Sequence, residues 1–365
     1  MKMAAMDEAL ELARRGAGCT SPNPAVGAVL VKDSEVIGRG FHTYAQRKHA
    51  EILALDQAGE RARGATLYIT LEPCSHHGRT PPCADALVNA GVAGVVAAME
   101  DPNPLVAGKG FRRLADAGIT VEMASEYAEE AAQLNEAFIH AMRTGGPLVT
   151  LKAALTLDGK IAAPEDNTGW ITSERARAHV QQIRHNSDAI LTGIGTVLSD
   201  DCLLTDRTGL ERSRPLLRIV ADSTLRIPLD SRIVTSFNGD LAILTTSAAS
   251  EDRRHMLEHR GVRVLVFDGP GGRTDLGKLV EYLACENYRS LMIESGSKLN
   301  WAALEAGIVD KVFFYYAPKI LGGLRSLPVA GGAGRLHRRD AIQLSRVKLH
   351  SIPPDEFALE AYVEK

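Results

Sequence analysis

Between residues 71 and 83 the chain reads Leu71-Glu72-Pro73-Cys74-Ser75-His76-His77-Gly78-Arg79-Thr80-Pro81-Pro82-Cys83. Upstream, His49-Ala50-Glu51 opens an expected helix, Pro73-Cys74 ends an expected strand, and Cys83 begins the next expected helix. A catalytic zinc ion takes three protein ligands of these types and keeps a fourth position for water. A carboxylate that is not a ligand must then move the proton of that water to the leaving ammonia. The pattern therefore predicts a zinc deaminase site with His49, Cys74 and Cys83 as ligands and Glu51 as the catalytic proton shuttle.

The same residues have other interpretations. A histidine and a glutamate two residues apart are common on solvated helix faces, and Cys74 and Cys83 could be small buried core residues. His76 and His77 are rival ligands. A non-enzymatic zinc scaffold would close its site with four ligands, whereas the natural set here is three with a carboxylate beside it. For the rest of the chain, the alternative to a second enzyme is a domain that only binds a metabolite.

Composition narrows the class of protein. The 365 residues are 45% hydrophobic and 24% charged, which is ordinary for a globular chain, and the length favours two domains. The net charge of −3 and an aromatic content of 5% argue against the rival enzyme, a nucleic-acid base deaminase with a basic stacking groove.

An acidic start and short apolar runs predict a cytoplasmic protein with no membrane span. Five cysteines, an odd number, favour metal ligands over a disulfide framework. We expect small-molecule substrates, no nucleic-acid partner and a homo-oligomer.

Helix and strand patterns alternate along the chain, which predicts an α/β fold with a partly parallel sheet. The first domain is expected to begin with a helix over residues 3–15 and to end with one Ala/Glu-rich helix over residues 125–143. Gly145-Gly146-Pro147 stops that helix and separates an expected deaminase domain, 1–145, from an expected reductase domain, 146–365. Strands are expected at 25–31, 65–71, 92–99 and 119–123, then at 148–155, 189–192, 216–221, 241–245, 262–267, 291–294 and 309–316, with closing antiparallel strands near 342–349 and 356–363.

The spacing of the two cysteines indicates a family. Zinc deaminases generally carry Pro-Cys-x2-Cys, whereas eight residues separate Cys74 from Cys83. With this expanded spacer, and with Pro22-Asn23-Pro24-Ala25-Val26-Gly27 and Asp101-Pro102-Asn103-Pro104, the chain resembles the bifunctional riboflavin-biosynthesis deaminase–reductases (the RibD family) over essentially its whole length. The resemblance implies a cytidine-deaminase-like α/β/α N-terminal domain that acts on a diaminopyrimidinone bearing a ribosylamino phosphate.

Several polar residues of this first domain are suited to that substrate. Asn23, His42, His76 and Arg79 could bind its ring edges, ribose or phosphate, the arginine through its fork of donors. The alternative for each is a surface loop residue. Gln46 stands where the family usually has Gly, so we expect the backbone before His49 to differ locally from the family's.

The second domain has no Gly-x-Gly-x-x-Gly after its first strand, so that dinucleotide fingerprint is not available. Small residues instead follow several strands, where backbone N–H groups at a helix start can approach a pyrophosphate. The segments 152–160, 168–174, 193–201 and 294–297 resemble, in this order, the reductase half of the same family. That resemblance implies a C-terminal dihydrofolate-reductase-like α/β domain that uses NADPH. The implied cofactor contacts are Ala154, Trp170, Thr196, Asp200, Ser223 and the turn Gly296, Ser297, Lys298, Leu299, Asn300, Trp301 and Ala302.

The resemblance also implies substrate contacts in this domain, with two arginines on the substrate phosphate. The implied contacts are Thr168, Arg184, Leu204, Arg207 and Glu294. Cys202 stands where the family favours Pro, and Asp206 where an apolar residue is usual, so we expect the phosphate pocket to differ in its fine shape but to keep its charges. The implied reaction transfers hydride from the nicotinamide to the ribose carbon attached to nitrogen. No side chain stands out in the sequence as the general acid of that step.

Overall fold

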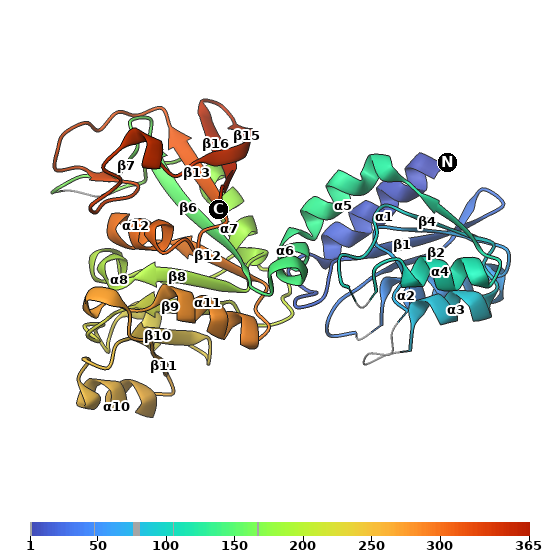
Figure 1. The fold of residues 1–365 in the computed structure, drawn as a ribbon, viewed down its shortest axis with the longest axis horizontal. Helices are drawn as coiled ribbons and strands as arrows, with labels where there is room; N and C mark the ends of the chain where they lie inside the picture. Colours follow the sequence, from blue (N-terminus) through green and yellow to red (C-terminus); the bar gives the residue numbers. More distant parts are fainter. Residues whose placement is uncertain (1, 47, 76–80, 105, 166–167) are drawn as a thin grey trace. The chain divides into compact units, whose positions relative to one another are not determined.

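The computed structural model describes residues 2–46, 48–75, 81–104, 106–165 and 168–365. The chain divides into two compact units. Unit 1 comprises Met1–Gly145 together with the short segment Glu211–Arg214, and unit 2 comprises Gly146–Leu210 and Pro215–Lys365. In Figure 1, unit 1 is mainly the blue to blue-green ribbon and unit 2 the green to red ribbon. Among the described residues, no helix has both the length and the apolar character that crossing a membrane requires.

Unit 1 is built on a mixed sheet with the strand order β2-β1-β3-β4-β5. β1 pairs antiparallel with β2 and β3, whereas β3, β4 and β5 run parallel. Its strands are β1 (Gly27–Lys32), β2 (Glu35–Phe41), β3 (Thr66–Ile69), β4 (Gly94–Ala97) and β5 (Thr120–Met123). Its helices are α1 (Lys2–Gly16), α2 (Ala50–Ala58), α3 (Cys83–Ala90), α4 (Lys109–Asp116), α5 (Ala128–Leu134) and α6 (Glu136–Thr144).

The core of unit 1 lies on both faces of this sheet, because successive strand residues point to opposite sides. Ala28 and Leu30 of β1 pack in the cluster that contains residues of α2, α3 and α4, whereas Val29 between them packs with α1. Tyr68 in β3 and Val96 in β4 join Val29 on the α1 side. Unit 1 is therefore a three-layer α/β/α sandwich, which confirms the architecture expected from the sequence (Figure 1).

Strand β2 was not among the expected strands, and its glycines explain the omission. A Cβ atom on Gly38 would lie 2.2 Å from the carbonyl oxygen of Ala54, and one on Gly40 would lie 2.1 Å from that of Ala50. Both carbonyls belong to α2, which packs directly on the β2 backbone. At these two positions the covered face of the strand therefore has no room for side chains, and the usual alternation of apolar residues is missing.

The single helix expected over residues 125–143 is interrupted at Asn135, so that expectation was wrong in detail. A 3₁₀ turn at Ser125–Tyr127 precedes α5, and Asn135, with a φ of −110°, separates α5 from α6. The Asn135 side chain is 3% exposed. Its Oδ1 accepts a hydrogen bond from the N–H of Ala25 at 2.7 Å, and its Nδ2 donates to the carbonyl of Ala25 at 3.0 Å. The helix is broken where one amide side chain binds the backbone leading into β1.

Unit 2 contains a long sheet with the strand order β11-β10-β9-β8-β12-β6-β13-β16-β15. Neighbouring strands are parallel from β11 to β13, and the pairings β13–β16 and β16–β15 are antiparallel, as expected for the two closing strands. The strands of this sheet are β6 (Leu148–Thr156), β8 (Ala189–Gly193), β9 (Leu217–Ala221), β10 (Leu241–Thr245), β11 (Arg263–Val266), β12 (Ser290–Glu294), β13 (Lys311–Ala317), β15 (Leu344–Ile352) and β16 (Glu356–Val363). A small separate sheet pairs β7 (Lys160–Ala162) with β14 (Leu327–Pro328).

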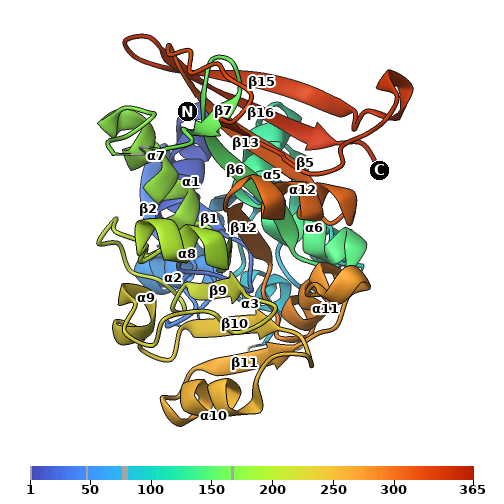
Figure 2. The same cartoon turned by 90° about the vertical axis from the view of Figure 1, so that its left-hand side faces the viewer.

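Helices cover both faces of the long sheet (Figure 2). Apolar residues of α7, α8, α9 and α10 pack in one cluster, and those of α11 and α12 pack in the other. Because the strands from β11 to β6 are parallel, the helices that follow them begin at one edge of the sheet, where ligands bind in open α/β folds. The helices are α7 (Glu174–His185), α8 (Ile194–Asp200), α9 (Arg232–Thr235), α10 (Glu251–His259), α11 (Leu276–Cys285) and α12 (Ser297–Glu305).

Candidate functional sites

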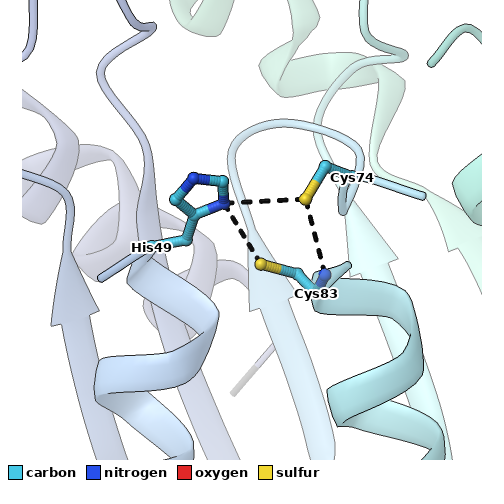
Figure 3. A group of neighbouring side chains, drawn as sticks. All are labelled: His49, Cys74 and Cys83. Carbon is cyan, nitrogen blue, oxygen red and sulfur yellow. Dashed lines mark hydrogen bonds between the residues drawn. The ribbon is translucent and has the colours of Figure 1, made fainter. Parts of the chain in front are cut away.

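Unit 1 brings the three expected metal ligands together. His49 is the residue immediately before α2, Cys83 is the first residue of α3, and Cys74 lies in the segment that follows β3. Their ligand atoms all lie within 4.8 Å of one another. The Nδ1 atom of His49 lies 3.2 Å from the sulfur of Cys83 and 3.6 Å from that of Cys74 (Figure 3). One nitrogen and two sulfurs at these separations fit a tetrahedral zinc ion with one position left for water.

The local electrostatics favour a thiolate on Cys74, whereas the hydrogen bond to Cys74, together with burial, raises the pKa of the Cys83 thiol. The N-termini of α2 and α3 meet at the site, and helix N-termini stabilise negative charge. The backbone N–H of Cys83 donates to the sulfur of Cys74 at 3.4 Å. A hydrogen bond from the Cys83 thiol also lowers the pKa of the Cys74 thiol, although burial opposes this. Both effects favour the deprotonated Cys74 sulfur that zinc requires.

Glu51 lies beside these ligands in the first turn of α2 and is 4% exposed. Burial raises the pKa of its carboxyl group to about 7, while the neighbouring His49 opposes that shift. A hydrogen bond joins it to the thiol of Cys83. A carboxyl group with a pKa near neutrality can both accept and return a proton at physiological pH.

Asn23 and His42, expected as substrate contacts, also meet beside the ligand set. The Asn23 Nδ2 atom lies 3.1 Å from the Nε2 atom of His42, whose ring is 5.3 Å from that of His49. Nδ1 of His42 lies 2.9 Å from the carbonyl oxygen of Lys48. Burial lowers the pKa of His42, so the neutral ring donates to Lys48 and accepts from Asn23. The other two expected contacts, His76 and Arg79, lie outside the described residues.

In unit 2, Glu294 at the end of β12 forms a charge cluster with two cations. Its Oε1 accepts from the ammonium group of Lys152 in β6 at 2.9 Å. Its Oε2 accepts from Nε and Nη2 of Arg184 at 3.0 and 2.8 Å. Burial opposes the negative charge, but Lys152 and Arg184 hold the pKa of Glu294 at about 2. Lys152 was missed in the sequence, although a charged residue inside the apolar run of β6 was the available signal.

The partners of Arg184 do not favour the phosphate contact expected for it. Its side chain is 8% exposed, and besides Glu294 it donates through Nη1 to the carbonyl of Thr205 at 3.0 Å. Arg184 therefore holds the 201–208 loop internally. That loop carries Leu204, which has a φ of +53°, and Arg207, which is exposed. Sequence reasoning could not anticipate this arrangement, because the partners lie 21 and 110 residues away in the chain.

The unusual Asp206 also has a partner. Its Oδ2 lies 2.9 Å from Nδ1 of His185, and both side chains are buried. His185 is the last residue of α7 and directly follows Arg184. The buried carboxylate at position 206 is therefore accommodated by the histidine at the end of α7.

The expected cofactor contacts follow neighbouring parallel strands. Ala154 lies late in β6, Thr196 near the start of α8, Ser223 just after β9, and Gly296 immediately before α12. The Oγ1 atom of Thr196 lies 3.9 Å from where a Cβ on Gly296 would stand. Because β9, β8, β12 and β6 are adjacent in the sheet, these four positions share its carboxyl edge.

The remaining expected contacts differ in how deeply their side chains are buried. Ser297, Asn300 and Trp301 at the start of α12 are buried, and the Ser297 Oγ, Asn300 Oδ1 and Trp301 Nε1 atoms have no hydrogen-bond partner within the described part of the chain. Such buried polar atoms are expected where a polar cofactor binds. Trp170 is 69% exposed, with the guanidinium of Arg177 4.8 Å from its ring centre. The other positions are exposed or half-buried: Lys298, Leu299, Ala302, Asp200 and Thr168.

Comparisons with known proteins agree with this architecture. Residues 1–99 match the model of the cytidine and deoxycytidylate deaminase zinc-binding region, and residues 147–355 match that of the RibD C-terminal domain. The riboflavin biosynthesis protein RibD of Escherichia coli is 45% identical over 365 residues, covering 96% of each chain.

Solved structures give the same result over the full length. RibD of Acinetobacter baumannii has a TM-score of 0.86 and 38% identity, covering 100% of this chain and 99% of that chain. A diaminohydroxyphosphoribosylaminopyrimidine deaminase/5-amino-6-(5-phosphoribosylamino)uracil reductase from Thermotoga maritima has a TM-score of 0.83 and 33% identity, with the same coverage. The chain therefore belongs to the RibD family of bifunctional deaminase–reductases, which act in riboflavin biosynthesis with zinc and NADPH.

Proposed function

We propose that residues 1–145 deaminate 2,5-diamino-6-ribosylamino-4(3H)-pyrimidinone 5′-phosphate, and that residues 146–365 reduce the ribosyl group of the resulting 5-amino-6-(5-phosphoribosylamino)uracil to ribityl. The observation that carries the proposal is the set of His49, Cys74 and Cys83 within 4.8 Å, with the buried Glu51 beside it. The substrates are those in the name of the Thermotoga maritima relative.

In the deaminase, His49, Cys74 and Cys83 hold zinc, which supplies the Lewis acidity that lets water attack near neutral pH. Glu51 takes a proton from the attacking water and delivers it to the amino group that leaves as ammonia. Asn23 binds the pyrimidine edge, with His76 and Arg79 completing the contacts to ribose and phosphate. His42 donates from Nδ1 to the carbonyl of Lys48 and accepts from Asn23 at Nε2, so it orients the Asn23 amide that faces the substrate.

In the reductase, NADPH supplies the hydride for the ribose carbon attached to nitrogen. Its binding residues are Ala154, Trp170, Thr196, Asp200, Ser223 and Gly296 to Ala302. Substrate binds to Thr168, Leu204, Arg207 and Glu294, with Arg207 on the phosphate. Arg184 positions Glu294 and the 201–208 loop, to which it donates at Thr205. Lys152, held at 2.9 Å from Glu294, is the cation suited to protonate the ribose oxygen as the ring opens.

The direct test is incubation of the purified chain with the diaminopyrimidinone phosphate, with product masses read with and without NADPH. Without NADPH we expect replacement of one amino group by oxygen and release of ammonia. With NADPH we expect the further addition of two hydrogens. No mass change without NADPH would refute the deaminase assignment, and no further change with NADPH would refute the reductase assignment.

The chain also has features that support a homo-oligomer in the cytoplasm. Leu344, Val347 and Leu349 are exposed on β15, the last strand of the long sheet, which leaves an apolar edge for a second copy. The cysteines are free thiols, as a reducing compartment would keep them. Light scattering during gel filtration tests the assembly, and a monomer at micromolar concentration would contradict it.

A further inference from the structure

Glu72 is a buried acid that the proposed chemistry does not use. It is 3% exposed and stands two residues before Cys74. Its Oε2 accepts hydrogen bonds from the backbone N–H groups of Asp101 at 3.2 Å and Gly108 at 2.9 Å. Its Oε1 accepts from those of Gly110 at 2.8 Å and Phe111 at 3.2 Å. One carboxylate thus binds backbone donors spread over residues 101–111.

Two of these donors lie in the first turn of α4, which begins at Lys109. The N–H groups of a first turn have no acceptor within the helix and carry partial positive charge. No acidic residue stands in the first turn of α4 itself. Glu72 therefore supplies, from another element, the negative charge that stabilises the start of this helix.

The backbone beside Glu72 is held equally closely. A Cβ on Gly110 would lie 2.0 Å from the carbonyl oxygen of Pro73, so only glycine allows this approach. The N–H of Glu72 donates to the carbonyl of Met99 at 3.0 Å. The chain is thereby fixed on both sides immediately before it reaches Cys74.

Cys74 in turn contacts the start of α3. Its carbonyl accepts from the N–H of Ala84 at 3.1 Å, and its sulfur accepts from the N–H of Cys83 at 3.4 Å. A shift of the Cys74 backbone would therefore alter both sulfur ligands. Groups that orient metal ligands in this way typically change metal affinity 10- to 100-fold when they are removed, by the order of magnitude known for other metal sites.

We infer that Glu72 is a positioning residue for the metal site: it fixes the backbone at residues 101, 108, 110 and 111 relative to Pro73 and thereby sets the place of the Cys74 sulfur opposite His49. The inference rests on the proposed function, because it takes His49, Cys74 and Cys83 as the zinc ligands.

The test compares Glu72→Gln with Glu60→Gln in the full chain. Glutamine keeps the size of Glu72 but turns an amide NH₂ toward two backbone donors. Glu60 is exposed in the same unit and serves as the matched control. We expect zinc affinity, measured by competition with a chelating dye, to fall about 10- to 100-fold in Glu72→Gln. The thiolate-to-metal absorption bands of the Co²⁺-substituted chain should shift, and deaminase kcat should fall with KM unchanged.

Two further variants keep the result interpretable. Gly110→Ala places a methyl group against the carbonyl oxygen of Pro73 and should shift the same Co²⁺ bands. The reductase activity of every variant should stay at the wild-type level. Wild-type zinc affinity and an unshifted Co²⁺ spectrum in Glu72→Gln would overturn the inference, even if its melting temperature fell. Cys74→Ser separates the ligand assignment from the role of Glu72. If Cys74→Ser keeps wild-type zinc affinity, the ligand assignment fails. If Cys74→Ser loses zinc while Glu72→Gln behaves as wild type, only the inference about Glu72 is refuted.

Discussion

At the scale of single residues, Glu51 combines a buried carboxyl group with a place beside the thiol of Cys83. Glu51→Gln keeps the size of the side chain and removes its ability to carry a proton. We expect the variant to retain zinc, measured by metal analysis, and to lose ammonia release by about 10²- to 10⁴-fold. Glu60→Gln should behave as wild type. Loss of zinc, or near-normal deamination, would contradict the assignment of the proton shuttle.

Glu294 makes a prediction about pH. Its pKa is held at about 2 despite burial, below the value near 4.3 expected in the unfolded chain. A depressed pKa stabilises the fold above the unfolded value, and this stabilisation is lost as pH falls toward the folded value. Glu294→Gln should therefore lower the unfolding free energy of the reductase unit by on the order of 2–3 kcal/mol above about pH 5, and the gap should narrow below about pH 4. Urea unfolding at several pH values measures it, and a constant gap down to about pH 3 would refute the explanation.

Arg207 is the exposed cation of the 201–208 loop. If it binds the substrate phosphate, Arg207→Ala removes a charge-assisted contact of about 1.5–3 kcal/mol. The KM for the deaminated phosphate should rise roughly ten- to a hundredfold, while the dissociation constant of NADPH stays near the wild-type value. Arg254→Ala, an exposed arginine of α10, is the control. Weaker NADPH binding with normal substrate binding would place Arg207 on the cofactor instead.

At the scale of elements, Asn135 shows how one side chain divides a helix and holds a strand entry. Asn135→Ala would leave the buried N–H and carbonyl of Ala25 without their amide partner. We expect a loss of about 2–4 kcal/mol in the unfolding free energy of unit 1, because unpaired buried polar groups are costly. Gln133→Ala, on the exposed side of α5, should change it by less than about 0.5 kcal/mol. Equal effects of the two changes would mean that the Asn135 contacts contribute little.

The same elements show what the sequence could predict. Short apolar runs with flanking helices marked β1, β3, β4 and most strands of unit 2, because burial on both faces leaves a local signal. The ligands His49, Cys74 and Cys83 were predictable as a group, because metal chemistry restricts residue type and spacing. Strand β2 was not predictable, because α2 packs directly on its backbone and glycines stand where apolar side chains would mark a strand. The internal role of Arg184 was not predictable from the sequence either, because its partner Glu294 lies 110 residues away and such a pairing leaves no local pattern.

At the scale of the whole molecule, the two residue sets lie in different units, but unit 1 is not one continuous piece of chain. The segment Glu211–Arg214 belongs to it. The N–H of Ser213 donates to the carbonyl of Gly18 at 3.0 Å, and the sulfur of Cys19 lies 2.8 Å from the carbonyl oxygen of Glu211. A chain cut after Gly145 would lack these contacts. The independence of the two reactions should therefore be tested in the intact protein.

Metal removal provides that test, because the proposed zinc ligands belong to unit 1 and the Lys152–Glu294–Arg184 cluster belongs to unit 2. Treating the intact chain with a zinc chelator should stop ammonia release, while purified deaminated intermediate is still reduced by NADPH at the wild-type rate. Added zinc should restore deamination, and circular dichroism should show that the fold persists throughout. Loss of reduction on chelation, in a chain that remains folded, would mean that the metal site and the reductase site are coupled. The two reactions would then not be independent modules.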